Sequence, residues 1–236
     1  MSAAADFRPI RTARAFEEIA GQIRGELALG RLRPGDRLPS ERALSEQLGV
    51  SRNTLREALR SLENAGLLKL KKGAAGGAFV AEETGSAVIA GLRDMYHLGA
   101  IGPDHLTEAR VWIESIAVRA ACERATPADL AAMRANIAAA RDAGADFFTR
   151  AEIHLEFHRL IARATRNPIM AIMMDAITDI MQHFIRAIGP HENRYVLPSR
   201  QRFMRHMEAR DAGAAVAEME SHLRRLHRYY LSKTAR

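Results

Sequence analysis

The first third of the chain alternates short amphipathic stretches with turn residues. Apolar side chains recur every three or four positions over residues 14–29, which predicts an amphipathic helix. Two further helices are predicted over residues 41–48 and 52–65, with Gly49 ending the first and Ser51 capping the second. Two short helices joined by a tight glycine turn are the outline of a helix-turn-helix.

The periodicity changes after the third predicted helix. LLKLKK (67–72) and AFV (78–80) are short alternating segments on either side of GAAGG (73–77). This arrangement predicts a β-hairpin with a glycine-rich tip. A helix-turn-helix followed by such a hairpin is a winged helix, so we expect a winged-helix DNA-binding domain over residues 10–80.

From about residue 84 onward the pattern is helical, without strand-type alternation. Breaks that contain glycine or proline divide this part into six or seven helices, as in an α-helical bundle. The predicted fold is therefore mainly α. It combines an N-terminal winged helix-turn-helix, which has a small β-hairpin wing, with a C-terminal all-helical bundle over residues 84–232. The junction is expected at residues 81–86.

Composition narrows the class of protein. No apolar run approaches the roughly 18 residues of a membrane span, and the N-terminus has no secretory pattern, so a cytoplasmic protein without membrane contact is expected. The net charge is +7, and residues 1–80 hold 14 Lys and Arg against 9 Asp and Glu. The basic excess is thus concentrated in the first third, which suits contact with a polyanion there.

The start of the helix predicted over residues 52–65 has the chemistry of a DNA-reading element. The polar side chains gathered there are Arg52, Asn53, Thr54 and Arg56. Arginine suits bidentate bonding to guanine and asparagine suits adenine, while leucines recur on the opposite side of the helix. Arg42 can reach backbone or bases from the preceding helix, and the backbone NH groups that follow Ser51 favour phosphate. The alternative is a solvated amphipathic helix, which the flanking glycine turn and hairpin make the poorer interpretation.

Four sequence motifs fall within residues 14–80, namely PGDRLPSER, LGVSR, LREALRSLE and GGAFV. Together they resemble the winged-helix domain of GntR-type bacterial transcription regulators. The resemblance implies a homodimer that binds a pseudo-palindromic operator in double-stranded DNA. The DNA contacts that it implies are Arg42, Arg52 and Arg56, assisted by Asn53, Thr54, Lys72 and Gly73.

The second half carries LTEARVWIESIAVRAACERATPADLAAM, EFHRLIARATRNP and ARDAGAAVAEMESHL. These motifs resemble those of the all-helical effector domain of the FadR subgroup, called FCD, and the resemblance extends over about residues 84–232. The resemblance implies a central pocket for a small organic acid. In many such domains an Asp and a His four residues apart on one helix hold a divalent metal, together with two histidines from later helices.

The stretch HLEFH, residues 154–158, departs from that pattern. His158 and His222 stand at metal-ligand positions of the family, but His154 replaces the aspartate and Arg200 replaces the remaining histidine. In one interpretation His154, His158 and His222 bind one divalent metal ion of the Zn, Ni or Mn type. In the other the metal is absent and Arg200 binds an effector carboxylate through a bidentate fork. A cation at Arg200 repels a bound metal unless an anion lies between them.

Arg110 matches a family position that points into the pocket, so it is a further candidate for carboxylate contact. Its alternative role is an ion pair with Glu114, four residues along the same helix. Trp112, two residues further on, is predicted to lie in the core or in the pocket wall.

These features predict a ligand-responsive transcriptional regulator, a repressor that a small carboxylate releases from DNA, and not an enzyme. The rival is a metal-dependent hydrolase or lyase built on the histidines of the helical domain. Beside the histidine pair only Glu152 and Glu156 can act as a base, and no Ser or Cys nucleophile motif is found.

Overall fold

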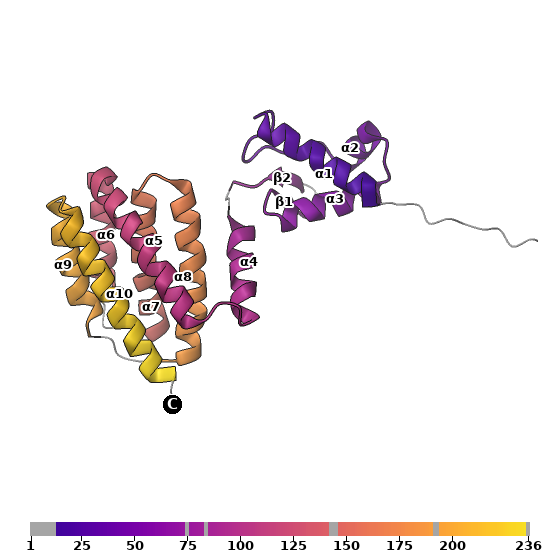
Figure 1. Cartoon of the computed structure of the whole chain (residues 1–236). Coiled ribbons are helices and arrows are strands. Elements are labelled where there is room, and N and C mark those ends of the chain that lie inside the picture. Colours follow the sequence, from indigo (N-terminus) through magenta and orange to yellow (C-terminus); the bar gives the residue numbers. More distant parts are fainter. Residues whose placement is uncertain (1–12, 74–75, 83–84, 142–145, 191–193, 235–236) are drawn as a thin grey trace, which may run out of the picture. The chain divides into compact units, whose positions relative to one another are not determined.

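A computed structural model describes residues 13–73, 76–82, 85–141, 146–190 and 194–234 (Figure 1). Within the predicted domain limits, residues 10–12 and 84 lie outside the described residues, as do residues 74–75 at the expected hairpin tip. The chain divides into two compact units, Met1–Ala87 and Val88–Arg236.

The N-terminal unit has the element order of a winged helix. Its described elements are α1 (Ala13–Ala28), α2 (Glu41–Leu48), α3 (Arg52–Asn64), β1 (Leu68–Lys71) and β2 (Gly77–Val80). The strands are antiparallel, with Leu68 opposite Val80 and Lys71 opposite Gly77. Leucines of α3 pack against α1, α2 and the hairpin in one apolar cluster, in which Leu55 and Leu62 are fully buried.

Local sequence explains the turn between α2 and α3. Gly49 ends α2 with a φ of 65°, a left-handed conformation that glycine adopts without steric cost. Ser51 then caps α3, because its side-chain oxygen accepts a hydrogen bond from the Thr54 backbone N–H at 3.1 Å. The cap sets the direction in which the polar start of α3 points.

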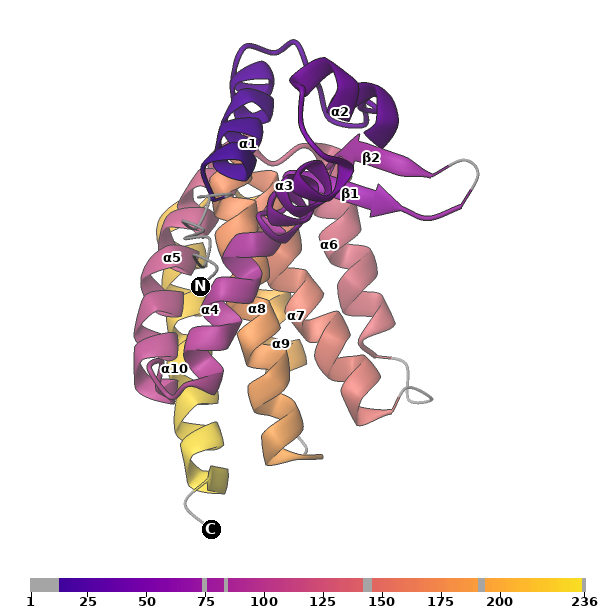
Figure 2. The ribbon, with the colours of Figure 1, turned by 90° about the vertical axis from the view of Figure 1, so that its right-hand side faces the viewer.

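The helical unit contains seven helices among the described residues, α4 beginning two residues before the unit boundary (Figure 2). They are α4 (Ser86–His97), α5 (Pro103–Arg124), α6 (Pro127–Ala139), α7 (Phe147–Ala164), α8 (Pro168–Ile188), α9 (Val196–Glu208) and α10 (Ala212–Thr234). Pairs that pack side by side include α5 with α10 and α7 with α8. The predicted fold class, a winged helix-turn-helix with a helical bundle, is confirmed.

Two apolar clusters fill the bundle. One is centred on Phe157 and Phe203, and the other contains Ile180 and Phe184. Helices α5, α7 and α10 contribute to both clusters, so buried polar side chains on these helices are enclosed by the bundle. No helix in the described part of the chain is long and apolar enough to cross a membrane.

One sequence-based expectation about the bundle is wrong. Trp112 does not lie in the core or line the central cavity, since its side chain is 61% exposed. Helix α5 has apolar or small residues around most of its circumference, so the sequence pattern does not mark its outer face.

Candidate functional site

The polar start of α3 faces solvent. Arg52, Asn53 and Arg56 are exposed and Thr54 is half-buried, whereas Leu55 on the opposite side is fully buried. This arrangement separates a polar, cationic surface from the core face of the same helix, as a recognition helix requires.

Two arginines at this surface are held by acidic neighbours. Arg56 Nη2 lies 3.0 Å from Glu41 Oε2, and Arg42 Nε lies 3.3 Å from Glu46 Oε1. All four side chains are substantially exposed, and surface ion pairs of this kind contribute little to stability. Both guanidinium groups can therefore exchange a carboxylate for a phosphate or a base edge at low cost.

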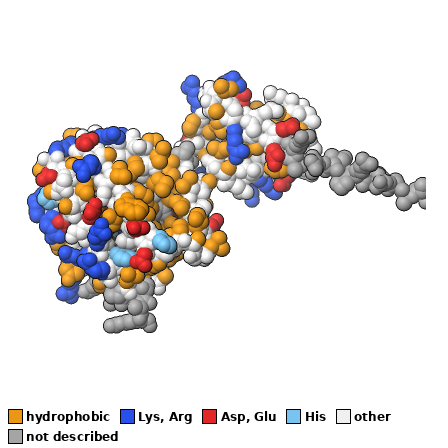
Figure 3. Space-filling view, viewed as in Figure 1, with side chains coloured by type: hydrophobic (Ala, Val, Ile, Leu, Met, Phe, Trp, Pro, Cys, Tyr) orange, Lys and Arg blue, Asp and Glu red, His pale blue; other side chains and the backbone are white. Residues whose placement is uncertain are grey.

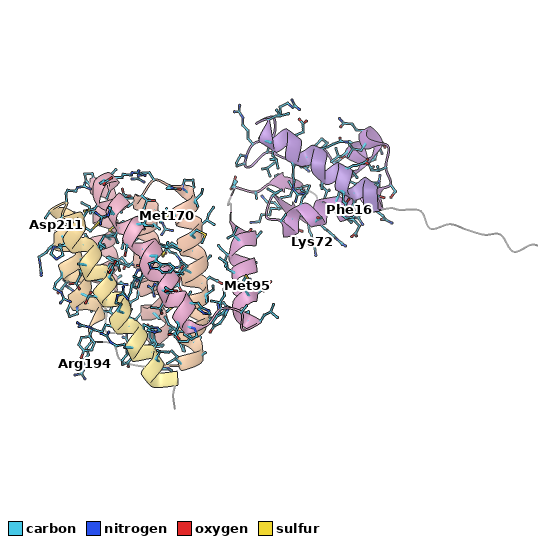
Figure 4. The ribbon with its side chains drawn as sticks, in the orientation of Figure 1. Phe16, Lys72, Met95, Met170, Arg194 and Asp211 are labelled. Atoms are coloured by element: carbon cyan, nitrogen blue, oxygen red, sulfur yellow. The ribbon has the colours of Figure 1, made fainter. Side chains whose placement is uncertain are left out.

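Arg37, a residue that the sequence interpretation did not single out, contacts the wing at two points. Its Nη2 donates to the carbonyl oxygen of Gly76 at 2.5 Å, and its guanidinium lies over the Phe79 ring. Lys71 Nζ covers the same ring, 4.5 Å from its centroid. Lys72 and Gly73 follow in exposed positions, and Figure 4 shows the Lys72 side chain projecting from the unit.

A cavity of about 420 Å³ lies inside the helical unit. Side chains of α5, α7, α8, α9 and α10 line it, and the sequence-predicted residues among them are Arg110, His154, His158, Arg200 and His222. The fold thus brings together residues that are up to 112 positions apart in the chain, from Arg110 to His222. No acidic side chain is among the described lining residues.

Glu114 lies behind the cavity wall, where its carboxylate neutralises the charge of Arg110. Its two carboxylate oxygens accept hydrogen bonds from Arg110 Nε at 2.5 Å and from His158 Nδ1 at 2.6 Å, and all three side chains are buried. Burial alone would raise the pKa of Glu114, but His158 and Arg110 lower it to about 2. Arg110 therefore makes the ion pair with Glu114 that was considered from the sequence, and it also lines the cavity.

Arg200 has no such neutralising partner. Its Nη2 donates to the His154 carbonyl oxygen at 2.5 Å and its Nη1 to Asn136 Oδ1 at 3.4 Å, and the guanidinium stacks over Phe157. Its Nε has no hydrogen-bond partner, and no carboxylate of the described residues forms an ion pair with it. Burial, assisted by the charge of Arg110, lowers the pKa of Arg200 to about 9, so the group is cationic at neutral pH.

The three histidines are neutral at pH 7. Burial, followed by the charges of Arg200, His158 and Arg150, lowers the pKa of His154 to about 3. Burial is also the main reason why the pKa of His158 falls to about 4 and that of His222 falls well below its ordinary value. His154 Nδ1 and His222 Nε2 are buried without a hydrogen-bond partner among the described residues. Both atoms therefore have unsatisfied hydrogen-bonding capacity, in residues that line the cavity.

The donor set does not suit the divalent metal that the family resemblance implies. In the described part of the chain, no three His, Cys, Asp or Glu side chains are grouped closely enough to hold a metal ion. The Arg200 guanidinium, a fixed cation, lines the same cavity as the three histidines and lowers the pKa of His154 and His222 by its charge. A cation there opposes a second cation and favours an anion.

Several contributors to the cavity had no signal in the sequence. Asn136 accepts a hydrogen bond from Arg200, and Tyr230, Arg150 and Arg194 are among the residues that line the cavity. Arg194 lies at the outer edge of the unit, as Figure 4 shows, and Arg150 is half-buried. Their positions depend on how separate helices pack, and no local pattern of residues reports that.

Comparison with known families matches both units. The family model described as "Bacterial regulatory proteins, gntR family" matches residues 15–80, and the FCD domain model matches residues 105–225. The second match alone covers half of the chain. The matched ranges contain the α3 surface and most of the cavity lining, respectively.

Similar individual proteins are also transcription regulators. The "Putative L-lactate dehydrogenase operon regulatory protein" of Escherichia coli (strain K12) is 31% identical over 91% of this chain and 85% of its own length. The Uxu operon transcriptional regulator of the same organism is 33% identical over 66% of this chain and 61% of its own length. A solved structure of Streptococcus agalactiae GntR has a TM-score of 0.68 at 22% identity, covering 90% of this chain and 99% of that chain, and shows the same fold.

Proposed function

Since the chain belongs to the GntR family of bacterial regulatory proteins and is a DNA-binding transcriptional regulator rather than an enzyme, we propose that a small organic acid bound in its helical unit controls its affinity for DNA. The FadR subgroup is the assignment that its FCD domain favours. The comparisons give no support to a hydrolase or lyase built on the histidines.

The buried cation at Arg200 is the observation that carries this proposal. An unpaired charge inside a protein costs several kcal/mol, and a bound counter-ion recovers that cost. The unpartnered Nε and the adjacent Nη atoms form the fork that binds a carboxylate through two parallel hydrogen bonds. The effector is therefore an anion whose carboxylate lies against Arg200, and no metal ion is needed to hold it.

The neutral histidines indicate what else the ligand carries. His154 Nδ1 and His222 Nε2 can each donate to or accept from a hydroxyl or carbonyl group next to the carboxylate. A hydroxy acid or oxo acid therefore forms more hydrogen bonds with the polar groups of the cavity than a plain fatty acid does. The name of the E. coli relative refers to an L-lactate dehydrogenase operon, so L-lactate, a 2-hydroxy acid, is the first compound to test.

DNA binding uses the α3 surface and the wing. We assign base and backbone contacts to Arg42, Arg52 and Arg56, with support from Lys72 at the wing, in a homodimer on a pseudo-palindromic operator. Further contacts are assigned to Ser51, Asn53, Thr54 and Gly73. The effector binds the DNA-free state better than the DNA-bound state, so the protein acts as a repressor that its ligand releases.

Calorimetric titration of the protein with a panel of hydroxy, oxo and dicarboxylic acids tests the effector site. We expect one ligand per chain, and we expect the Arg200→Gln variant to lose at least tenfold in affinity, as removal of a buried bidentate pair implies. Arg202→Gln is the matched control, because Arg202 lies two residues away on α9 and pairs with Glu218 outside the cavity. Equal affinity in the Arg200→Gln variant and the wild type would refute the site.

A further inference from the structure

The outer face of α5 carries two large apolar side chains that the rest of the helical unit does not cover. Trp112 is 61% exposed and Ile116, one turn further on, is 64% exposed. Figure 3 shows hydrophobic side chains gathered over α5 on one face of the helical unit, next to acidic and histidine side chains, with basic side chains over α10. Contiguous exposed apolar side chains on a folded unit mark an interaction surface, and tryptophan is enriched at the centre of such surfaces.

Opposite charges flank this apolar pair along the helix. Glu108 lies one turn before Trp112, and Arg119 lies one turn after Ile116; both are exposed. Positions 108, 112, 116 and 119 fall within roughly 80° of the helix circumference, so they form one stripe on one face. Glu108 and Arg119 are about 16 Å apart along the axis, too far to pair within one helix.

Along the chain the stripe runs from an acidic side chain through two apolar ones to a basic one. The same stripe in the opposite direction runs from basic to acidic, so two antiparallel copies match each other. If a second copy of α5 lies antiparallel across it, with the two-fold axis near position 114, Glu108 faces Arg119 of the second copy. Trp112 then faces Ile116 of the second copy, and both contacts occur twice. A closed two-fold dimer requires such a self-complementary patch, and pairing of acidic with basic ends fixes its register.

We propose that the stripe Glu108, Trp112, Ile116 and Arg119 is the centre of the homodimer interface of the helical unit. The occupant of this surface is a second copy of the chain, with α5 packed antiparallel on its equivalent. The inference rests on the proposal above that the protein is a dimer, and it assigns the surface that joins the two copies.

Reversal of the two charges tests the pairing directly. In the full-length protein, Glu108→Arg alone and Arg119→Glu alone each place like charges opposite one another at two equivalent points. We expect each to raise the dimer dissociation constant, measured by sedimentation, at least about tenfold. The double variant restores opposite charges, and its dissociation constant should return to within about threefold of wild type. Arg205→Glu, an exposed change on α9, is the control and should leave the dimer unchanged.

Trp112 is the single tryptophan of the chain, so its fluorescence provides an independent test of the interface that needs no variant. Trp112 emission should shift to shorter wavelength, and acrylamide quenching should weaken, over the concentration range in which the dimer forms. A dimer in which Trp112 stays as accessible as in the monomer, or in which the single reversals have no effect, overturns the interface. Dissociation by both single variants without rescue by the double variant overturns the register.

The experiment separates this inference from the proposed function. A dimer joined through another surface would refute the α5 interface but leave carboxylate binding by the Arg200 cavity intact, which titration measures on its own. A protein that stays monomeric at every concentration and on DNA would refute both the interface and the dimeric operator complex.

Discussion

The carboxylate of Glu114 accepts a hydrogen bond from His158 Nδ1 at 2.6 Å, although 44 positions separate the two residues in the chain. The same carboxylate accepts from Arg110, so one buried anion orients both a cation and a neutral imidazole at the cavity wall. With its Nδ1–H donated to Glu114, His158 presents Nε2 as an acceptor. The carboxylate therefore fixes which groups the cavity offers to a ligand.

Loss of this carboxylate should destabilise the helical unit. In a Glu114→Gln variant the side chain keeps its size, but Arg110 becomes a buried cation without its counter-charge, and Arg200 loses the favourable influence of the Glu114 charge. Breaking a buried ion pair in this way costs about 3–5 kcal/mol. The free energy of unfolding, measured by urea denaturation, should fall by that amount.

Glu208 is the control for this measurement. It forms an ion pair with Arg134 at 2.7 Å, but both side chains are well exposed, and Glu208→Gln should cost less than about 1 kcal/mol. Equal losses in the two variants would show that the Glu114 charge has no special role.

A metal chelator separates the two interpretations of HLEFH. Because Arg200 supplies the positive charge, prolonged dialysis against EDTA should leave the affinity for the carboxylate effector unchanged, and elemental analysis should find less than one metal ion per chain. A drop in affinity of tenfold or more, reversed by Zn, Ni or Mn, would instead favour a site made by His154, His158 and His222. The titration is repeated with Arg200→Gln, which should bind weakly with or without chelator.

Sequence reasoning succeeds where the determinant is local. Ser51 caps α3 and Gly49 turns the chain before it, and both effects depend on neighbours within three residues. The cavity residues His158 and Arg200 were found through a family pattern, and no periodicity in this chain marks them. The Glu114–His158 bond and the support of Arg200 by the His154 carbonyl join separate helices, so only the packed bundle reveals them.

Acid should weaken the helical unit, because its cavity histidines are buried in their neutral form. The pKa of His154 is lowered to about 3 and that of His158 to about 4, whereas the unfolded chain protonates its histidines near 6.5. Between these values the unfolded state binds more protons, so stability is full above about pH 6.5 and is lost as the pH falls toward 4. Each of the two histidines should remove on the order of 1–2 kcal/mol between pH 7 and pH 5.

Urea denaturation at a series of pH values measures this loss. A His154→Gln variant removes one of the three buried histidines with a lowered pKa, so its free energy of unfolding should depend less steeply on pH between 7 and 5. His206→Gln, on α9 outside the cavity lining, provides the comparison. A flat profile in the wild type would contradict the neutral, buried state of these imidazoles.

The α3 surface and the wing should make distinguishable contributions to DNA binding. Arg52→Ala removes a side chain placed to bond base edges, so affinity for the operator should fall by about 1–3 kcal/mol, with a smaller effect on unrelated DNA. Lys72→Ala removes a phosphate contact, so it should weaken binding to the operator and to unrelated DNA alike. The slope of log affinity against log salt concentration should become shallower by about one. Arg60 lies further along α3 beside Glu57 and is the matched control. Mobility shifts across a salt series measure all three variants, and an Arg60→Ala variant as impaired as Arg52→Ala would mean that overall charge, rather than the start of α3, carries recognition.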